Sequence, residues 1–319
     1  MARRARLKPA DRGVYYHLTN RIAGMEGDYP FGDAEKQKFI DLLKNLSSFF
    51  TIEILSYQVM GNHWHIICYA PAGILSPAKA AERYNRHYEG KKAPLSPDDP
   101  QCGAVALQMR DISCLVGWLQ QQFSTWYNKT RTRRRRGTLW ADRFKSVILE
   151  RATALWHCMC YVEMNPVRAH LVEDPAQYPF GTWGEWCAVG KHPFGSNLAT
   201  HLPAYEGKYT VSRTLPEIGQ RFRAAFKRLM TEDPAHVQWR EPREAGPGTK
   251  CRSPHLAPTG TPRVRQWSDG LIVGRESFVR KTARQLKHDM KASEHRLDRA
   301  HGASLEGLCS YRRLRTIEI

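Results

Sequence analysis

Residues 51–70, TIEILSYQVMGNHWHIICYA, constrain the fold of this chain more than any other stretch. Residues 51–60 and 63–70 are rich in β-branched, aromatic and other apolar side chains, which are typical of strands. The Gly61–Asn62 pair between them is a turn signal. The stretch therefore predicts a β-hairpin that is buried for most of its length.

The second strand of this hairpin carries two histidines, His63 and His65, on either side of Trp64. Because alternate side chains of a strand point to the same face of the sheet, both imidazoles are expected to face the same way. Two such imidazoles suit one divalent metal ion, which needs a third ligand from elsewhere. Alternatively, His63 caps the turn and His65 is a core histidine with its hydrogen bonds satisfied. The spacing alone leaves both interpretations open.

The other elements expected from periodicity alternate between strands and helices. They are a strand at 13–22, helices at 33–50, 77–89, 111–130 and 152–165, and a hairpin within 131–150, with a loop at 90–103 and Pro166 as the helix stop. The order strand, helix, strand, strand, helix, helix, hairpin, helix predicts an α+β fold in which helices pack on a mostly antiparallel sheet.

The charge of the chain indicates a polyanionic partner. Its 49 Lys and Arg exceed its 31 Asp and Glu, which gives a formal net charge of +18. Such an excess favours nucleic acid or an anionic membrane surface. No apolar run is long enough to cross a membrane, and the basic N-terminus has no apolar stretch behind it. The eight cysteines lack zinc-site spacing and are expected to be reduced. A cytoplasmic, nucleoid-associated protein without a membrane partner is expected.

The basic excess is concentrated in the C-terminal third. Residues 207–319 hold 23 of the Lys and Arg but 12 of the Asp and Glu. Within this segment, residues 240–263 are rich in Pro and Gly and read as a linker, and 277–300 are a basic helical stretch. We expect a catalytic domain at 1–205 and a basic extension at 206–319. The extension either contacts phosphates or packs on the first domain and completes its core.

A tyrosine and an asparagine lie four residues apart in CYVEMNPVRAHLV, residues 160–172. On a helix, Tyr161 and Asn165 share a face. Beside a metal ion, a phenol loses its proton more readily than its ordinary pKa of about 10 allows. It can then attack an electrophile such as phosphorus and form a covalent intermediate. Asn165 is a candidate third metal ligand through its amide oxygen, or alternatively a helix cap before proline.

A run of arginines with two aromatic residues follows the 111–130 helix. Basic side chains around Trp140 and Phe144 suit phosphate contacts and base stacking, and the alternative is that both rings lie in the core. The candidate DNA-binding residues of the whole chain are Arg21, Arg133, Arg134, Arg135, Arg136, Trp140, Arg143, Lys145 and Arg168.

Four blocks in this order and spacing resemble a known family. YHLTNR at 16–21, VMGNHWHII at 59–67, GTLWADRFKS at 137–146 and YVEMNPVRAHLV at 161–172 are similar to the REP-associated tyrosine transposases. These belong to the HUH superfamily of single-tyrosine transposases of small bacterial insertion sequences. The resemblance covers roughly residues 10–190, and His170 stands where the family usually has a glycine.

The resemblance implies a ferredoxin-like, RRM-like HUH endonuclease fold and a DNA strand-transfer activity. It implies that His63 and His65 hold Mg²⁺ or Mn²⁺ together with Asn165, and that Tyr161 attacks single-stranded DNA and leaves a 5′-phosphotyrosine. The implied partner is a hairpin or palindromic repeat in single-stranded DNA, bound by a monomer or homodimer. A DNA-binding regulatory or architectural protein with little catalysis, and a metal-dependent hydrolase in which water attacks, are the alternatives.

Overall fold

A seven-stranded mixed sheet forms the centre of the molecule, in the order β2-β3-β1-β4-β7-β9-β8. The computed structural model describes residues 6–24, 30–132, 137–202, 204–206, 209–211, 214–232, 267, 270–285, 298–299 and 308–311. All neighbouring strands of this sheet are antiparallel except β4 and β7, which are parallel. The α+β fold with a mostly antiparallel sheet is therefore confirmed.

The strands of the sheet are β1 (Val14–Arg21), β2 (Glu53–Val59), β3 (His63–Ala70), β4 (Lys145–Leu149), β7 (Ile272–Arg275), β8 (Asp298–Arg299) and β9 (Leu308–Tyr311). The short strands β5 (Ala204–Glu206) and β6 (Tyr209–Val211) form a separate antiparallel pair. The predicted hairpin is confirmed, because β2 pairs with β3 across the turn.

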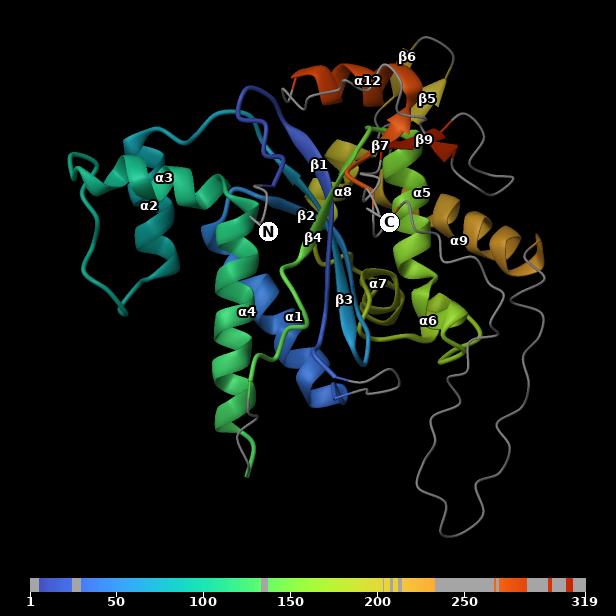
Figure 1. The fold of residues 1–319 in the computed structure, drawn as a ribbon, viewed down its shortest axis with the longest axis horizontal. Coiled ribbons are helices and arrows are strands. Elements are labelled where there is room, and N and C mark those ends of the chain that lie inside the picture. Colours follow the sequence, from blue (N-terminus) through green and yellow to red (C-terminus); the bar gives the residue numbers. More distant parts are fainter. Residues whose placement is uncertain are drawn as a thin grey trace, which may run out of the picture.

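Helices cover both faces of the sheet (Figure 1). Those on one side are α1 (Asp33–Phe49), α2 (Pro77–His87), α3 (Gln101–Arg110) and α4 (Ile112–Lys129). Those on the other are α5 (Thr153–Glu163), α6 (Asn165–Arg168), α7 (Thr182–Val189), α8 (Gly195–His201) and α9 (Leu215–Glu232), with the 3-10 turn η1 (Pro175–Gln177). None of the described helices is long and apolar enough to cross a membrane.

Strand alternation divides the core between these two layers. On β3, Trp64 and Ile66 belong to the core beneath α1 and α4, whereas Ile67 belongs to the core beneath α5. Trp64 and Ile66 have no exposed surface, and burying each large apolar side chain contributes about 1.5–3 kcal/mol. His63 and His65 have the same parity as Ile67 and therefore face the α5 layer.

The C-terminal segment is part of this core. The strand β7 pairs with β4, and Ile272 and Val273 on it are fully buried. On α9, Phe222 stacks on Trp156 of α5 with ring centroids 4.5 Å apart. The helix α12 (Glu276–Gln285) packs on β7 and β9. The described part of residues 206–319 thus packs on the first domain, and its expected phosphate contacts stay a prediction. The expected linker at 240–263 and the end of the helix expected at 277–300 lie outside the described residues.

Three local expectations are corrected. The strand β4 does not form a hairpin with a described neighbour within 131–150, because it pairs with the distant β1 and β7. The helix α3 starts at Gln101, inside the loop expected at 90–103. Pro166 does not end the helical region: α5 ends at Glu163, and Pro166 occupies the first turn of α6, where a missing N–H costs nothing.

Candidate active site

Three histidines meet on the face of the sheet that α5 covers. The antiparallel register places Arg21 of β1 opposite His63 and Thr19 opposite His65. His17, two residues from Thr19 on β1, is therefore the diagonal neighbour of His65 on the same face. The rings of His17 and His65 stack with centroids 5.0 Å apart. The sequence analysis did not select His17, although a histidine inside the apolar strand VYYHLT was a signal that could have done so.

A chain of hydrogen bonds fixes which nitrogen of His65 is free. The backbone oxygen of Trp267 can only accept, so Nδ1 of His17, 2.7 Å away, donates to it. The Nε2 atom of a neutral His17 must then accept. It lies 2.8 Å from Nδ1 of His65, which is therefore the donor. This order leaves Nε2 of His65 with its lone pair free of these bonds.

A hydrogen bond to the neighbouring Asn62 fixes the same tautomer in His63, with the proton on Nδ1. Its Nδ1 lies 2.7 Å from Oδ1 of Asn62 and donates to that oxygen, which leaves the Nε2 lone pair outside this bond. The rings of His63 and His65 have centroids 5.1 Å apart and are nearly perpendicular, at 88°. Metal-bound histidines usually donate their second ring N–H in this way, to an acceptor that fixes the tautomer.

All three imidazoles are held neutral. Burial lowers the pKa of His17 to about 4, although its hydrogen bond to Trp267 acts in the opposite direction. Burial, with Arg21 and Arg168 nearby, lowers the pKa of His63 to about 4. Burial and then the neighbouring His17 hold the pKa of His65 well below its ordinary value. Neutral imidazole is the form that binds a metal ion.

Tyr161 lies against this histidine cluster from the opposing helix α5. Its ring centroid is 6.1 Å from that of His65 and 6.5 Å from that of His17, edge-on to both. The guanidinium of Arg168, from α6, lies 4.2 Å from the centre of the Tyr161 ring and donates to the Tyr161 backbone oxygen at 2.6 Å. The structure thus brings together the predicted tyrosine, both predicted histidines and one predicted arginine.

Asn165 acts at the end of α5. Its side-chain nitrogen donates to the backbone oxygens of Tyr161 and Val162, at 3.3 and 3.2 Å. The capping function expected for an asparagine before proline is therefore present. An amide that caps with its nitrogen still has its oxygen to offer, so capping and ligation are compatible.

The donors fit a divalent ion in part. In the described part of the chain, no three His, Cys, Asp or Glu side chains are grouped so that they could hold a metal ion. His63 and His65 supply two neutral nitrogens, and the amide of Asn165 is the one further protein ligand expected. Divalent ions such as Mg²⁺ commonly keep water and bind substrate phosphates in their remaining positions. An open site of this kind suits a phosphate-processing ion better than a structural one.

Basic side chains surround the histidine end of the sheet face. Lys145 lies beside Thr19 in the β1–β4 register and so shares the face of the histidines, about two strand spacings or ~10 Å from His65. Arg143 lies just before β4 and is exposed. Arg21 and Arg168 lie near His63, where their positive charge helps to lower its pKa. Arg133, Arg134, Arg135 and Arg136 lie outside the described residues.

Trp140 and Phe144 do not present stacking surfaces. Trp140 is 9% exposed, its ring contacts those of Phe31 and Phe123, and its Nε1 donates to Ser124 Oγ at 2.9 Å. Phe144 is 7% exposed, and the guanidinium of Arg6 covers its ring at 3.5 Å. Of the two interpretations of these aromatics, core packing is the one that the structure supports.

The site and fold define an α+β protein with a histidine–tyrosine centre that has Arg21 and Arg168 beside it. No protein-family model matches the chain, and no curated protein matches it. Among solved structures, a REP-associated tyrosine transposase bound to a REP hairpin is similar at 14% sequence identity and a TM-score of 0.39. That comparison covers 67% of this chain and 99% of the other.

Proposed function

We propose that this chain cleaves and rejoins single-stranded DNA through a covalent tyrosine intermediate. One observation carries the proposal: Tyr161 lies against His65 and beneath Arg168, on the face where His63 and His65 leave their Nε2 atoms outside their fixed hydrogen bonds. The four motif blocks and the net charge of +18 support DNA as the substrate. A hairpin or palindromic repeat is the proposed form of that DNA.

The chemistry conserves phosphodiester bonds. The phenol of Tyr161 loses its proton as its oxygen forms a bond to phosphorus. The bond from phosphorus to the 3′-oxygen breaks, and that oxygen takes up a proton to become the 3′-hydroxyl. The product is a 5′-phosphotyrosine, itself a phosphodiester, so a 3′-hydroxyl can reverse the step without ATP. Arg168 and Arg21 place positive charge where the phosphate carries its negative charge.

A divalent ion, when bound, would polarise the phosphoryl oxygen and orient the phosphate. The residues that would hold it are His63, His65 and the amide of Asn165. His17 and Asn62 hold the two imidazoles in the tautomer that such binding needs. Mg²⁺ or Mn²⁺ is the proposed ion.

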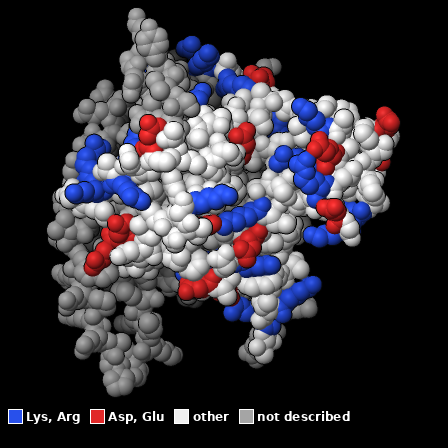
Figure 2. Space-filling model, turned by 180° about the vertical axis from the view of Figure 1, so that it is seen from behind, with Lys and Arg blue, Asp and Glu red and all other residues white. Residues whose placement is uncertain are grey.

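Basic side chains are spread over the molecular side shown in Figure 2, with acidic ones between them, so the phosphate contacts have to be assigned residue by residue. We assign them to Arg21, Lys145 and Arg168 near the cluster, and to the exposed Arg143 just before β4. Phosphate contacts of this kind position the strand and leave base identity to other groups.

The test is a Tyr161→Phe variant incubated with single-stranded DNA from the flanks of its own gene and analysed on a denaturing gel. We expect cleavage and covalent adduct to disappear together while DNA binding remains. Tyr69→Phe is the matched control, because Tyr69 lies on the same face of β3 but packs against Tyr15 and His201. The nucleophile assignment fails if the Tyr161→Phe protein nicks DNA at the native rate.

The same gel separates the alternatives. His63→Ala and His65→Ala, or excess EDTA with the native protein, should abolish the adduct, and Mn²⁺ should restore it to the chelated protein. Cleavage without any adduct would indicate a hydrolase in which water attacks. Binding with neither product would indicate a regulatory or architectural DNA-binding protein.

A further inference from the structure

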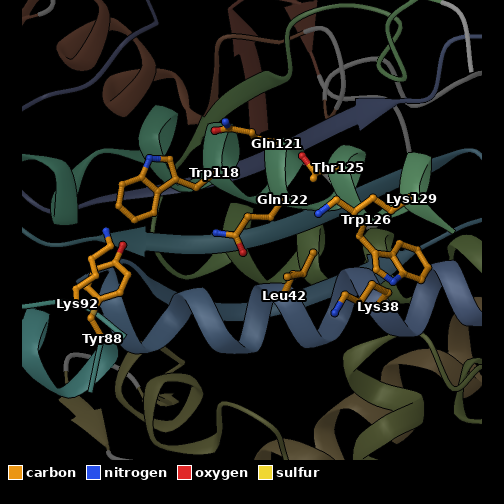
Figure 3. A pocket seen from close by; sticks show the side chains of 10 residues that line it. All are labelled: Lys38, Leu42, Tyr88, Lys92, Trp118, Gln121, Gln122, Thr125, Trp126 and Lys129. Atoms are coloured by element: carbon orange, nitrogen blue, oxygen red, sulfur yellow. The ribbon is translucent and has the colours of Figure 1, made fainter. Parts of the chain in front are cut away.

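A groove lies between α1 and α4, on the side of the sheet away from the histidines. Its volume is about 620 Å³. Figure 3 shows Trp118, Trp126 and Lys129 along α4, with Lys38 facing them from α1. Tyr88 and Lys92, at and just after the end of α2, close one end. None of these residues belongs to the candidate active site.

The groove is cationic without a compensating acid. Lys38, Lys92 and Lys129 line it, and none of the described Asp or Glu residues does. A second copy of a chain with net charge +18, or one of its own basic segments, would be repelled from such a surface. A polyanion is the occupant that this charge favours.

The two tryptophan side chains of the groove contact the core on one side and are partly exposed on the other. Trp118 stacks on Phe49 of α1 with centroids 4.9 Å apart, and Trp126 packs against Phe123 at 5.6 Å. Both indoles are partly exposed, whereas Phe49 and Phe123 are buried. Each tryptophan is therefore a rigid ring held by the core on one side and accessible from the groove on the other.

The spacing of these rings suits a short run of bases. Trp118 and Trp126 are eight residues apart on one helix, which is about 12 Å along its axis. Stacked nucleotides rise about 3.4 Å each, so roughly three or four of them span this distance. Near each end a lysine accompanies the ring: Lys92 lies 3.8 Å from the centre of the Tyr88 ring, and Lys38 lies 5.9 Å from that of Trp126.

We propose that this groove binds a few nucleotides of single-stranded nucleic acid, with bases against Trp118 and Trp126 and phosphates beside the three lysines. Stacking on aromatic rings in a positively charged groove is how proteins hold single strands without reading their sequence. Since the groove and Tyr161 lie on opposite sides of the sheet, it would hold a part of the strand away from the cleaved phosphate. The proposal does not depend on cleavage and stands whether or not Tyr161 is a nucleophile.

The charge part is tested with the full chain by fluorescence anisotropy on labelled oligo-dT and oligo-U at several salt concentrations. The triple variant Lys38→Gln, Lys92→Gln and Lys129→Gln should lower the log–log salt slope by about 2, because each single-strand phosphate contact contributes about 0.7. The control carries Lys191→Gln, Lys227→Gln and Lys281→Gln, the same charge change at three exposed sites outside the groove. Equal slopes in the two triple variants would overturn the phosphate assignment. A larger effect on one oligonucleotide than on the other would identify DNA or RNA as the natural strand.

Base stacking is tested by removing a tryptophan ring from the groove and comparing a strand that has bases with one that lacks them. Trp126→Ala should weaken oligo-dT binding about five- to ten-fold but leave binding to an abasic strand of equal length unchanged. Photo-crosslinking of bromodeoxyuridine DNA to the unmutated protein, with the adduct mapped by mass spectrometry, should give α4 peptides. This second measurement keeps the test valid if Trp126→Ala does not fold. The proposal is contradicted if Trp126→Ala weakens binding of the normal and the abasic strand equally, or if crosslinks occur only in other elements. It is also contradicted if polyglutamate displaces DNA from the groove alone, which would indicate an acidic peptide as the occupant.

Discussion

The protonation pattern of the site depends on one histidine that lies in the YHLTNR block but was assigned no function from the sequence. His17 joins the backbone oxygen of Trp267 to Nδ1 of His65, through bonds of 2.7 and 2.8 Å. Its side chain has no exposed surface and its pKa is lowered to about 4 by burial, so it stays neutral near pH 7. A neutral His17 can accept from His65 only if it donates to Trp267. The C-terminal segment, which contains Trp267, thereby sets the tautomer of a histidine in the first hairpin.

We predict that His17 acts as a positioning residue for His65. His17→Gln keeps an acceptor near the former Nε2 position, whereas His17→Leu removes it. The Leu variant should need about 10- to 100-fold more Mn²⁺ for half-maximal cleavage, which is the usual effect of losing a partner of a metal-bound histidine. The Gln variant should stay much closer to the native value. Calorimetric titration with Mn²⁺ alone measures the same affinity without DNA.

The comparison of the two variants also separates positioning from packing. A purely structural role would lower the melting temperature of both variants and leave the Mn²⁺ requirement unchanged. That result would remove His17 from the site and leave the Tyr161 proposal as it stands.

Residue patterns predicted the common face of His63 and His65 because strand alternation is a local rule. They could not predict His17 as their partner, since that contact depends on which residues of β1 and β3 oppose each other. The sequence could not predict the burial of Trp140 either. An aromatic residue within a basic stretch looks the same in sequence whether it faces solvent or, as here, the ring of Phe123.

At the scale of elements, local signals located helices and strands well and pairings less well. The helix predicted at 33–50 is α1 at Asp33–Phe49, because the apolar positions repeat with helical spacing over four turns. The hairpin predicted within 131–150 was wrong for the described residues. The short strand β4 pairs with β1 and β7, each more than 100 residues away along the chain. The residues of β4 themselves do not indicate these partners.

The start of α5 carries backbone strain that sequence reasoning did not expect. Ala152 is the N-cap residue and has φ of +71°, a conformation that disfavours residues with a Cβ atom. At the other end, His170 has φ of +53° and occupies the position where the family resembled usually has glycine. The tyrosine-bearing segment is thus bounded by two left-handed residues.

Glycine at position 152 should relieve the first of these strains. We predict that Ala152→Gly stabilises the protein by about 1 kcal/mol, because glycine adopts positive φ without the Cβ clash. Ala154→Gly, two residues later and inside the helix, is the control. Because Ala154 has no exposed surface, this change should destabilise by about 1–2 kcal/mol through helix propensity and the lost buried methyl group. Urea denaturation gives both values. If both substitutions destabilise equally, the positive φ at Ala152 is not a source of strain.

At the scale of the whole molecule, the central sheet is built from two distant parts of the chain. The strands β1 to β4 come from the first 149 residues, and β7, β8 and β9 come from after residue 271. The later strands have four residues or fewer, and they occur in a segment rich in Lys, Arg, Pro and Gly. Strands this short carry too few alternations to be recognised in sequence, so the C-terminal third reads as an extension although its described strands complete a core.

This architecture makes a prediction about removing the C-terminal segment. A chain that ends at residue 206 loses β7 and with it the pairing of the β4 edge, together with the fully buried Ile272 and Val273. It also loses Phe222 and Phe226, which pack against Trp183 of α7. Each buried aromatic or large aliphatic side chain contributes about 1.5–3 kcal/mol, and the net stability of a folded protein is about 5–15 kcal/mol. For the four named side chains this amounts to about 6–12 kcal/mol, which is as large as the whole net stability. We therefore expect the shortened chain to be insoluble or to unfold without a cooperative transition in urea, whereas the full chain unfolds cooperatively.

Val273→Asp in the full chain should destabilise strongly by the same mechanism, while Lys281→Gln on the exposed side of α12 should not. A soluble shortened chain that unfolds cooperatively and differs from the full chain only by a shallower salt dependence of DNA binding would show instead that residues 207–319 serve as a basic DNA-binding extension.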